Sequence, residues 1–304
     1  MKNQFNLLVR RLCDKFSEEM NVTMNVTKGF SKRSLFEEKL CEGMCSTKTL
    51  RNLQNGNRNL DKLLQDEILS RLGAAAEEYI YLLDYDEYSR WKARQQILYH
   101  ITWNQPDAAQ RLLEDYRKHY DMGNRLEHQF ILSMTVQIQN LLGADRNRLL
   151  VLIEEALSLT VPSWKDERLT DLILSIRELN LILEAEQCRD DKGRPERYIE
   201  VINYLEKTGW DSRGMAKIYP KAVYFLCRSV AKSGSLKEDS RWNRAKILWY
   251  CNRGIDILRE NERMYYLWEL LGIRRALLDG MQQELLSQGE RKRADSLQLI
   301  YREN

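Results

Sequence analysis

From about residue 85 onward, the sequence repeats one pattern: two amphipathic segments joined by a short polar turn. Apolar residues recur every three or four positions within each segment, which predicts helices with one buried face. Each pair recurs after about 34 to 45 residues, a period typical of TPR-like repeats. One pair cannot bury both of its apolar faces, so neighbouring pairs must stack into an α-solenoid. We expect five pairs, at roughly 86–120, 125–160, 166–208, 213–259 and 262–301.

The composition supports an all-α chain. The 304 residues include only 4 Pro and 14 Gly, few breakers for a chain of this length. Hydrophobic residues make up 43% and charged residues 31%, a mixture that suits amphipathic helices. The expected turns coincide with Asn104-Gln105-Pro106, Gly123-Asn124, Gly143, Pro162, Gly193, Gly209, Gly234 and Gly280.

The first 75 residues predict mostly shorter helices than the rest of the chain. They predict one longer helix and three short ones, at 5–19, 34–42, 46–54 and 60–72. Gly43, Asn55-Gly56 and Gly73 separate the short helices, and a polar loop covers residues 20–33. We therefore expect a small helical domain at 1–75, followed by the helical repeats at 76–304.

The segment from Leu40 to Arg58 predicts two short helices around a tight turn. Gly43 permits the turn, Ser46 is a good N-cap, and Leu50 and Leu53 lie three apart on the inner face. The outer face then carries Thr47, Lys48, Arg51 and Asn52. Small polar and basic side chains at the start of a short helix suit the major groove of DNA. The whole chain has a net charge of only +3, so its basic surface must be local.

The order of residues in this segment resembles the phage-repressor (XRE-like) class of helix-turn-helix proteins. The matching pattern runs Gly43-Met44-Cys45-Ser46, Thr49-Leu50, Leu53, Asn55-Gly56 and Arg58, and residues 61–73 resemble the helix that closes that domain. The resemblance implies that Thr47, Lys48 and Asn52 face bases, and that Ser46, Arg51 and Arg58 contact the DNA backbone. Two positions depart from the family: Phe36 stands where the second helix opens, and Gln54 precedes Asn-Gly.

The second part of the chain resembles the sensor half of Firmicutes regulators of the Rgg/PlcR/PrgX group. The resemblance rests on residues 126–130, 149–162 and 217–222. It implies that a short peptide lies in the concave groove of the repeats and that the protein dimerises through them. Asn140, Asn180 and Tyr224, on the first helices of their pairs, are the candidate groove residues. The alternative, that they are ordinary polar surface residues, stays open.

Aromatic residues are concentrated near the C-terminus and allow two interpretations. They either pack between helices or form a dimer surface, since aromatic residues are enriched at interfaces. These residues are Trp242, Trp249, Tyr250, Tyr265, Tyr266 and Trp268. The six cysteines are scattered and suit reduced, buried thiols.

No set of residues in the sequence predicts catalysis. The three histidines lack nucleophile or carboxylate partners at a known spacing, and there is no glycine-rich phosphate loop. Cys41 and Cys45 lack the further ligands of a zinc site. We expect no enzyme activity, metal or cofactor. No apolar run is long enough to cross a membrane, and no signal-peptide pattern is present, so we expect a cytoplasmic protein.

These features predict a sequence-specific transcription regulator. Its partners would be double-stranded DNA, a short signalling peptide or a protein effector, and a second copy of itself. The alternative is an interaction scaffold whose helix-turn-helix no longer binds DNA. The repeats alone cannot separate the two, because TPR-like arrays bind proteins of many kinds.

Overall fold

The computed structural model describes residues 2–20, 32–57, 60–78, 84–119, 123–189, 193–234, 242–279 and 289–296. The regular elements in these ranges are all helices, which confirms the predicted all-α class. The chain divides into two compact units, Met1–Arg189 and Asp190–Asn304. The expected domain boundary after residue 75 remains a prediction.

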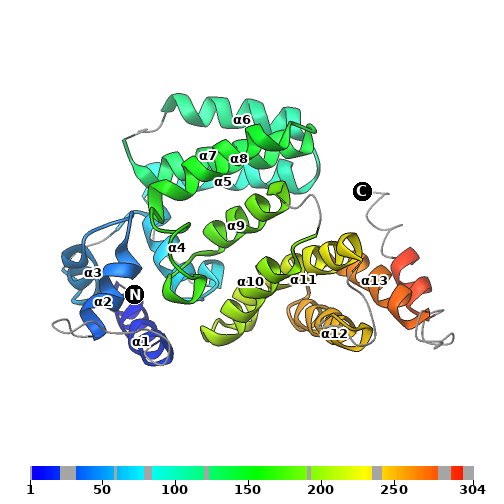
Figure 1. Cartoon of the computed structure of the whole chain (residues 1–304). Coiled ribbons are helices and arrows are strands. Elements are labelled where there is room, and N and C mark those ends of the chain that lie inside the picture. Colours follow the sequence, from blue (N-terminus) through cyan, green and yellow to red (C-terminus); the bar gives the residue numbers. More distant parts are fainter. Residues whose placement is uncertain are drawn as a thin grey trace. The chain divides into compact units, whose positions relative to one another are not determined.

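Unit 1 contains the four N-terminal helices and the first repeats (Figure 1). Its first four helices are α1 (Lys2–Met20), α2 (Lys32–Cys41), α3 (Thr47–Gln54) and α4 (Lys62–Arg71). The rest of the unit comprises the 3₁₀ turn η1 (Ala76–Glu78), α5 (Tyr85–Thr102), α6 (Pro106–His119), α7 (Arg125–Leu141), α8 (Arg146–Thr160), η2 (Leu169–Asp171) and α9 (Ile176–Arg189). The four N-terminal helices agree with the predicted spans. Most of the predicted loop at 20–33 lies outside the described residues.

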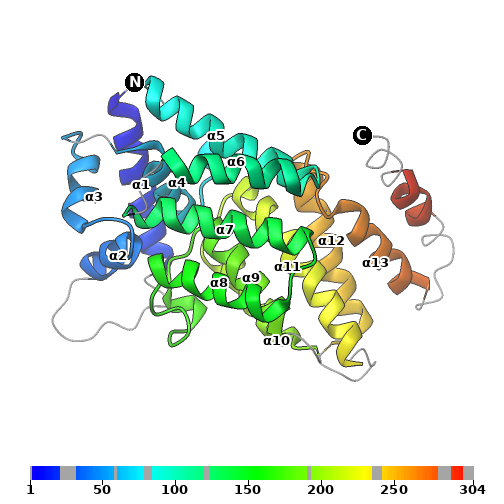
Figure 2. The ribbon, with the colours of Figure 1, turned by 90° about the horizontal axis from the view of Figure 1, so that it is seen from above.

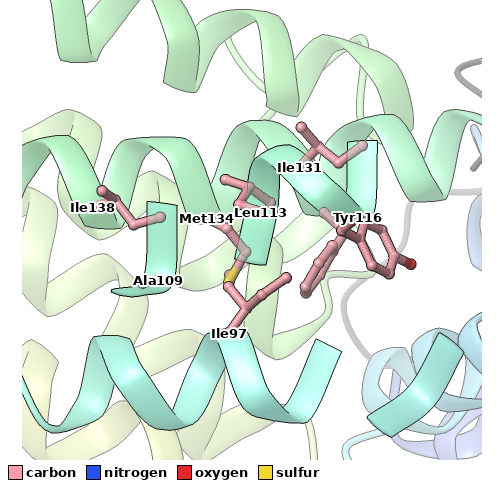
Figure 3. Close-up of a cluster of buried hydrophobic side chains, with 8 residues drawn as sticks. Ile97, Ala109, Leu113, Tyr116, Ile131, Met134 and Ile138 are labelled. Carbon is pink, nitrogen blue, oxygen red and sulfur yellow. The ribbon is translucent and has the colours of Figure 1, made fainter. Parts of the chain in front are cut away.

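The helices from α5 to α9 pack in chain order, each against the next, and Figure 2 shows α5 to α8 as neighbouring rows. The first two predicted pairs, 86–120 and 125–160, are therefore confirmed. Figure 3 shows part of the core that joins α5, α6 and α7. Its buried members are Ile97, Ala109, Leu113, Tyr116, Phe130, Ile131, Met134 and Ile138. The small side chain of Ala109 allows close approach of the helices, as the repeat pattern requires.

The third predicted pair, 166–208, is wrong in its first ten residues. They form an irregular stretch with a 3₁₀ turn, and Leu172, Ile173 and Leu174 in it are buried. Helix α9 begins later because Ser175 and Glu178 form a capping box. The Glu178 amide donates to Ser175 Oγ at 3.3 Å, and the Ser175 amide donates to the Glu178 carboxylate at 2.7 Å. The two helices of this pair also belong to different units.

Unit 2 contains α10 (Pro195–Lys207), α11 (Ser212–Ser233), α12 (Arg244–Glu260) and α13 (Leu267–Asp279). These helices also pack in chain order, which confirms the predicted pair at 213–259. In the fifth pair, 262–301, α13 is the first helix, and only residues 289–296 of the second part are described.

Most helices begin at a side-chain cap, and this explains why the pattern could place them. The capping residues are Ser46, Asp61, Asp84, Asn124, Asp145, Asp211 and Asn243. Each accepts a hydrogen bond from a free backbone N–H in the first turn of its helix.

Candidate nucleic-acid interface and its buried support

The helix-turn-helix is built on an apolar core shared by α1, α2 and α3. Leu50 and Leu53 on α3 are buried, as predicted from their spacing. Phe16 of α1 packs against Phe36 of α2, with ring centroids 6.2 Å apart. The resemblance placed Phe36 at the start of the second helix. The structure does not, because α2 begins at Lys32. An aromatic residue at position 36 is therefore a core residue and not an altered DNA contact.

The turn between α2 and α3 uses the two residues that the sequence predicted. Gly43 has a φ of +70°, in the left-handed region that favours glycine. Ser46 is the N-cap of α3: its hydroxyl accepts a hydrogen bond from the Thr49 amide at 3.2 Å. The hydroxyl also lies 3.0 Å from Thr49 Oγ1. Ser46 is exposed, but its first role is to start the helix.

The predicted base-facing residues lie on the solvent side of α3. Lys48 is exposed, and Thr47 and Asn52 are partly exposed. The Asn52 backbone carbonyl accepts a hydrogen bond from the Asn57 amide at 2.8 Å, which closes the turn after α3. Arg58 lies outside the described residues. The exposed side of α3 thus offers a hydroxyl and an ammonium from its first turn and an amide from its second turn, the groups that read base edges and phosphates.

Arg51 is held by a partner that the sequence analysis missed. Its side chain is 56% exposed, and its guanidinium donates to the Glu37 carboxylate of α2 at 2.8 Å. Arg33 also contacts Glu37, at 3.4 Å. Glu37 is buried, so this ion pair fixes the Arg51 side chain against α2. A phosphate could still reach the exposed side of the guanidinium.

Beneath the helix-turn-helix lies a fully buried arginine, Arg71, in the last turn of α4. One nitrogen, Nη1, donates to the carbonyl oxygens of Leu40 and Glu42, each at 2.9 Å. These carbonyls belong to the end of α2 and the turn that follows it. Arg71 thereby satisfies backbone acceptors that the end of a helix leaves without intrahelical partners.

The other side of Arg71 binds the repeats. Its Nη2 donates to Glu178 Oε1 at 2.5 Å and to the Thr160 carbonyl at 3.0 Å, and its Nε donates to Glu178 Oε2 at 3.1 Å. The Thr160 hydroxyl donates to Glu178 at 2.6 Å, and Gln129 of α7 donates to that hydroxyl at 2.5 Å. We call Arg71, Glu178, Thr160 and Gln129 the Arg71 cluster. It joins α2 and α4 to α7, α8 and α9.

The charges in the Arg71 cluster neutralise each other. Burial alone would raise the pKa of Glu178, but the Arg71 guanidinium and three hydrogen bonds hold this pKa below its ordinary value. Burial likewise opposes the charge of Arg71, and Glu178 raises the pKa of the guanidinium. Both groups therefore stay ionised at neutral pH.

Backbone packing reinforces the same junction. A Cβ on Gly43 would lie 2.3 Å from the Cα of Thr160, closer than any real contact. Ile176 N–H donates to Ser70 Oγ at 2.8 Å, and Arg177 pairs with the buried Glu67 at 2.8 Å. The helix-turn-helix and the end of α8 therefore meet without space for an added side chain at position 43.

The three candidate groove residues do lie on first helices of their pairs. Asn140 is exposed in the last turn of α7, and Asn180 is partly exposed on α9. Tyr224 is partly exposed on α11, in the other unit, with its ring 5.2 Å from that of Tyr266 and the Arg228 guanidinium 5.6 Å away. Their role in binding an effector remains a prediction.

The C-terminal aromatic residues divide between buried and exposed positions, and their role in a dimer remains a prediction. Trp242 and Tyr250 are buried in unit 2, whereas Trp249 and Tyr265 are more than half exposed. All six cysteines are free thiols, and Cys13, Cys41, Cys227 and Cys251 are buried. Within the described ranges there is no grouping of side chains able to hold a metal ion and no helix long and apolar enough to cross a membrane.

No protein-family model matches the sequence, and no curated protein matches it. The structure is similar to the crystal structure of Bacillus thuringiensis PlcR in complex with the peptide PapR7 and DNA. The TM-score is 0.55, the sequence identity is 13%, and the match covers 95% of this chain and 94% of that chain. At this identity the likeness shows the fold. The chain therefore has the architecture of a helix-turn-helix domain followed by TPR-like helix pairs.

Proposed function

We propose that this protein is a cytoplasmic, sequence-specific DNA-binding transcription regulator that dimerises and whose repeats bind a peptide or protein effector. The observation that carries the proposal is the exposed first turn of α3, supported from below by the Arg71 cluster. A rigidly supported helix with free polar and basic side chains is what direct reading of a major groove requires. The fold-level likeness to PlcR, a protein solved with DNA and a peptide, supports this proposal.

The effector would be a peptide or protein bound by the repeats, with Asn140, Asn180 and Tyr224 as candidate contacts. Amide side chains on the first helices of such repeats can pair with the backbone of an extended peptide. No cofactor or metal enters this proposal.

The test is binding to a pool of duplex DNA fragments at several salt concentrations. The wild type should select particular sequences, and its affinity should fall as salt rises because Lys48 and neighbouring cations release counterions. Lys48→Ala with Asn52→Ala should remove the sequence preference, at a cost of about 1–3 kcal/mol per lost base contact. Lys118→Ala with Asn147→Ala, at exposed positions on α6 and α8, is the matched control.

A folded wild-type protein that selects no sequence would refute the regulator. The interaction scaffold would then be the better account of the fold, and the exposed face of α3 would be a protein-binding surface.

A further inference from the structure

A pocket lies between α6 and α8, the second helices of the first two repeat pairs, with α7 between them (Figure 2). Its volume is about 330 Å³. This is the lower end of the roughly 300–1,000 Å³ of small-molecule sites, which suits a small metabolite and not a peptide. The effector groove is expected on the first helices of the pairs, so this pocket is a different surface. We call it the α6–α8 pocket.

Two arginines from different helices line the α6–α8 pocket. Arg117 lies in the last turn of α6 and Arg148 in the first turn of α8, and both are exposed. Within the described ranges neither guanidinium has an ion-pair partner. Two like charges beside one cavity repel each other until an anion binds there. Since the planar guanidinium matches a carboxylate in geometry, the pocket favours a carboxylate ligand.

The same pocket also carries acceptors for a donor group. Glu114, one turn before Arg117 on α6, accepts a hydrogen bond from the Gln110 side chain at 3.0 Å, and it has no cationic partner in the described part of the chain. The side-chain oxygen of Gln139 is buried and accepts no hydrogen bond from any described residue. A buried acceptor without a donor is unfavourable, and the charge of Glu114 favours a cationic donor. An ammonium group satisfies both requirements.

The remaining wall of the pocket is apolar. Leu113 of α6 and Ile138 of α7 are buried, and Leu142 at the end of α7 is 52% exposed. A hydrocarbon chain placed here would remove more of Leu142 from water. The lining residues that the structure describes include no aromatic ring, so the pocket does not suit the stacking of a nucleotide base.

We propose that the α6–α8 pocket binds a free α-amino acid with an apolar side chain. Arg117 and Arg148 hold its carboxylate. Glu114 and the Gln139 side-chain oxygen accept hydrogen bonds from its ammonium group, and its side chain lies on the apolar wall. The inference goes beyond the proposed function, because it assigns a small-molecule site outside the expected effector groove.

The first experiment measures binding to the full-length protein, without DNA, by isothermal titration calorimetry. L-leucine and L-methionine should each bind, with one molecule per chain. Isocaproate lacks the ammonium group and isoamylamine lacks the carboxylate, so each should bind at least about tenfold more weakly than L-leucine. N-acetyl-L-leucine stands for the C-terminal residue of a peptide and should also bind at least about tenfold more weakly.

The second experiment removes the cations. Arg117→Gln with Arg148→Gln should weaken L-leucine binding by at least about tenfold, since the carboxylate loses both of its charged donors. Arg111→Gln with Arg125→Gln is the matched control. It removes the same charge from exposed positions of α6 and α7 outside the pocket and should leave the affinity unchanged. Circular dichroism checks that both variants keep their helices.

The third experiment separates recognition of the ligand from support of the fold. Glu114→Gln should weaken L-leucine binding but leave isocaproate binding unchanged or stronger, because only L-leucine carries the ammonium group. A residue that merely supported the pocket would affect both ligands alike.

Three results would overturn the proposal: no binding of either amino acid at millimolar concentration, full affinity in the double variant of Arg117 and Arg148, or an unchanged preference for L-leucine in Glu114→Gln. None of these measurements involves DNA. A protein that binds L-leucine in this pocket but selects no DNA sequence would refute the regulator and leave the amino-acid site standing.

Discussion

Two buried arginines of unit 1, Arg71 and Arg94, bind buried glutamates in different ways. Arg94 of α5 donates to Tyr116 of α6 at 3.0 Å and to Glu127 of α7 at 3.2 Å, so its partners come from the next two helices. Arg71 reaches Glu178, 107 residues away, and four backbone carbonyls besides. The first arginine ties neighbouring helices within the repeats, and the second ties the repeats to the helix-turn-helix.

The difference shows which contacts unite the helix-turn-helix with the repeats. Contacts like those of Arg94 can recur in any stack of helix pairs, because its partners lie on the next two helices along the chain. The Arg71 cluster exists only where α2, α4, α8 and α9 meet. Substitutions in the two clusters should therefore damage different parts of unit 1.

The largest effect is expected for Arg71→Met. It leaves Glu178 buried without its counter-ion, which costs about 3–5 kcal/mol of unfolding free energy. Urea denaturation measures this loss, and hydrogen exchange should show weaker protection in α2, α3 and α9 together. Arg111→Met, on the exposed face of α6, should change the unfolding free energy by less than about 0.5 kcal/mol. Unchanged exchange in α2 and α3 would contradict the role of Arg71 as the link.

Arg94→Met should cost somewhat less, about 3 kcal/mol, because the Tyr116 hydroxyl remains as a partner for Glu127. The loss of protection should be confined to α5, α6 and α7. If α2 and α3 also lose protection as strongly as in Arg71→Met, the two arginines are not functionally distinct.

Glu178→Gln should cost about 2 kcal/mol at pH 7 and less in acid. The folded-state pKa of Glu178 lies below its ordinary value, so its ionised form stabilises the fold at neutral pH. This contribution is fully present above the ordinary pKa of a glutamate, about 4.3, and is lost as the pH falls from there through the lowered folded-state pKa. Burial raises the pKa of Glu67, and the charge of Glu178 raises it further, so part of the pH dependence of this difference comes from Glu67.

Urea denaturation at pH 7, 5, 4 and 3, the last of these below the ordinary pKa of a glutamate, measures this difference between wild type and Glu178→Gln. A difference that is constant across this range would show that the charge of Glu178 does not matter.

Thr160→Val should have the smallest effect, about 1 kcal/mol, since it removes one hydroxyl from the Arg71 cluster and keeps the shape. Thr135→Val is the matched control, because the Thr135 hydroxyl only donates to the Ile131 carbonyl of its own helix. Thermal unfolding should show a larger fall in Tm for Thr160→Val than for Thr135→Val. An equal fall in Tm would mean that the Thr160 hydroxyl does not contribute to the Arg71 cluster.

Much of the fold was predictable because its signals are local. Helical spacing, caps such as Asp84 and Asn124, and turn glycines lie within a few residues of the elements that they define. The start of α9 was missed although Ser175 and Glu178 carry the capping-box pattern, because the apolar run before them continued the helical spacing.

The candidate site was predictable only in part. The exposure of Lys48 and the capping by Ser46 follow from the helical period of one short segment. The Arg71 cluster could not be found in this way, since its charged partners are separated by more than a hundred residues. The ion pair between Glu37 and Arg51 also joins two different helices, so no local sequence pattern predicts it.

Gly43 restricts which substitutions the junction between the helix-turn-helix and the repeats can accept. The Thr160 backbone occupies the space where any other residue would place its Cβ, so the turn and the end of α8 can only vary together. A helix-turn-helix grafted from another protein would need both a glycine at this turn and an arginine equivalent to Arg71 beneath it. The helix-turn-helix of this protein is therefore not an interchangeable module, and chimeras should fail to fold at this junction.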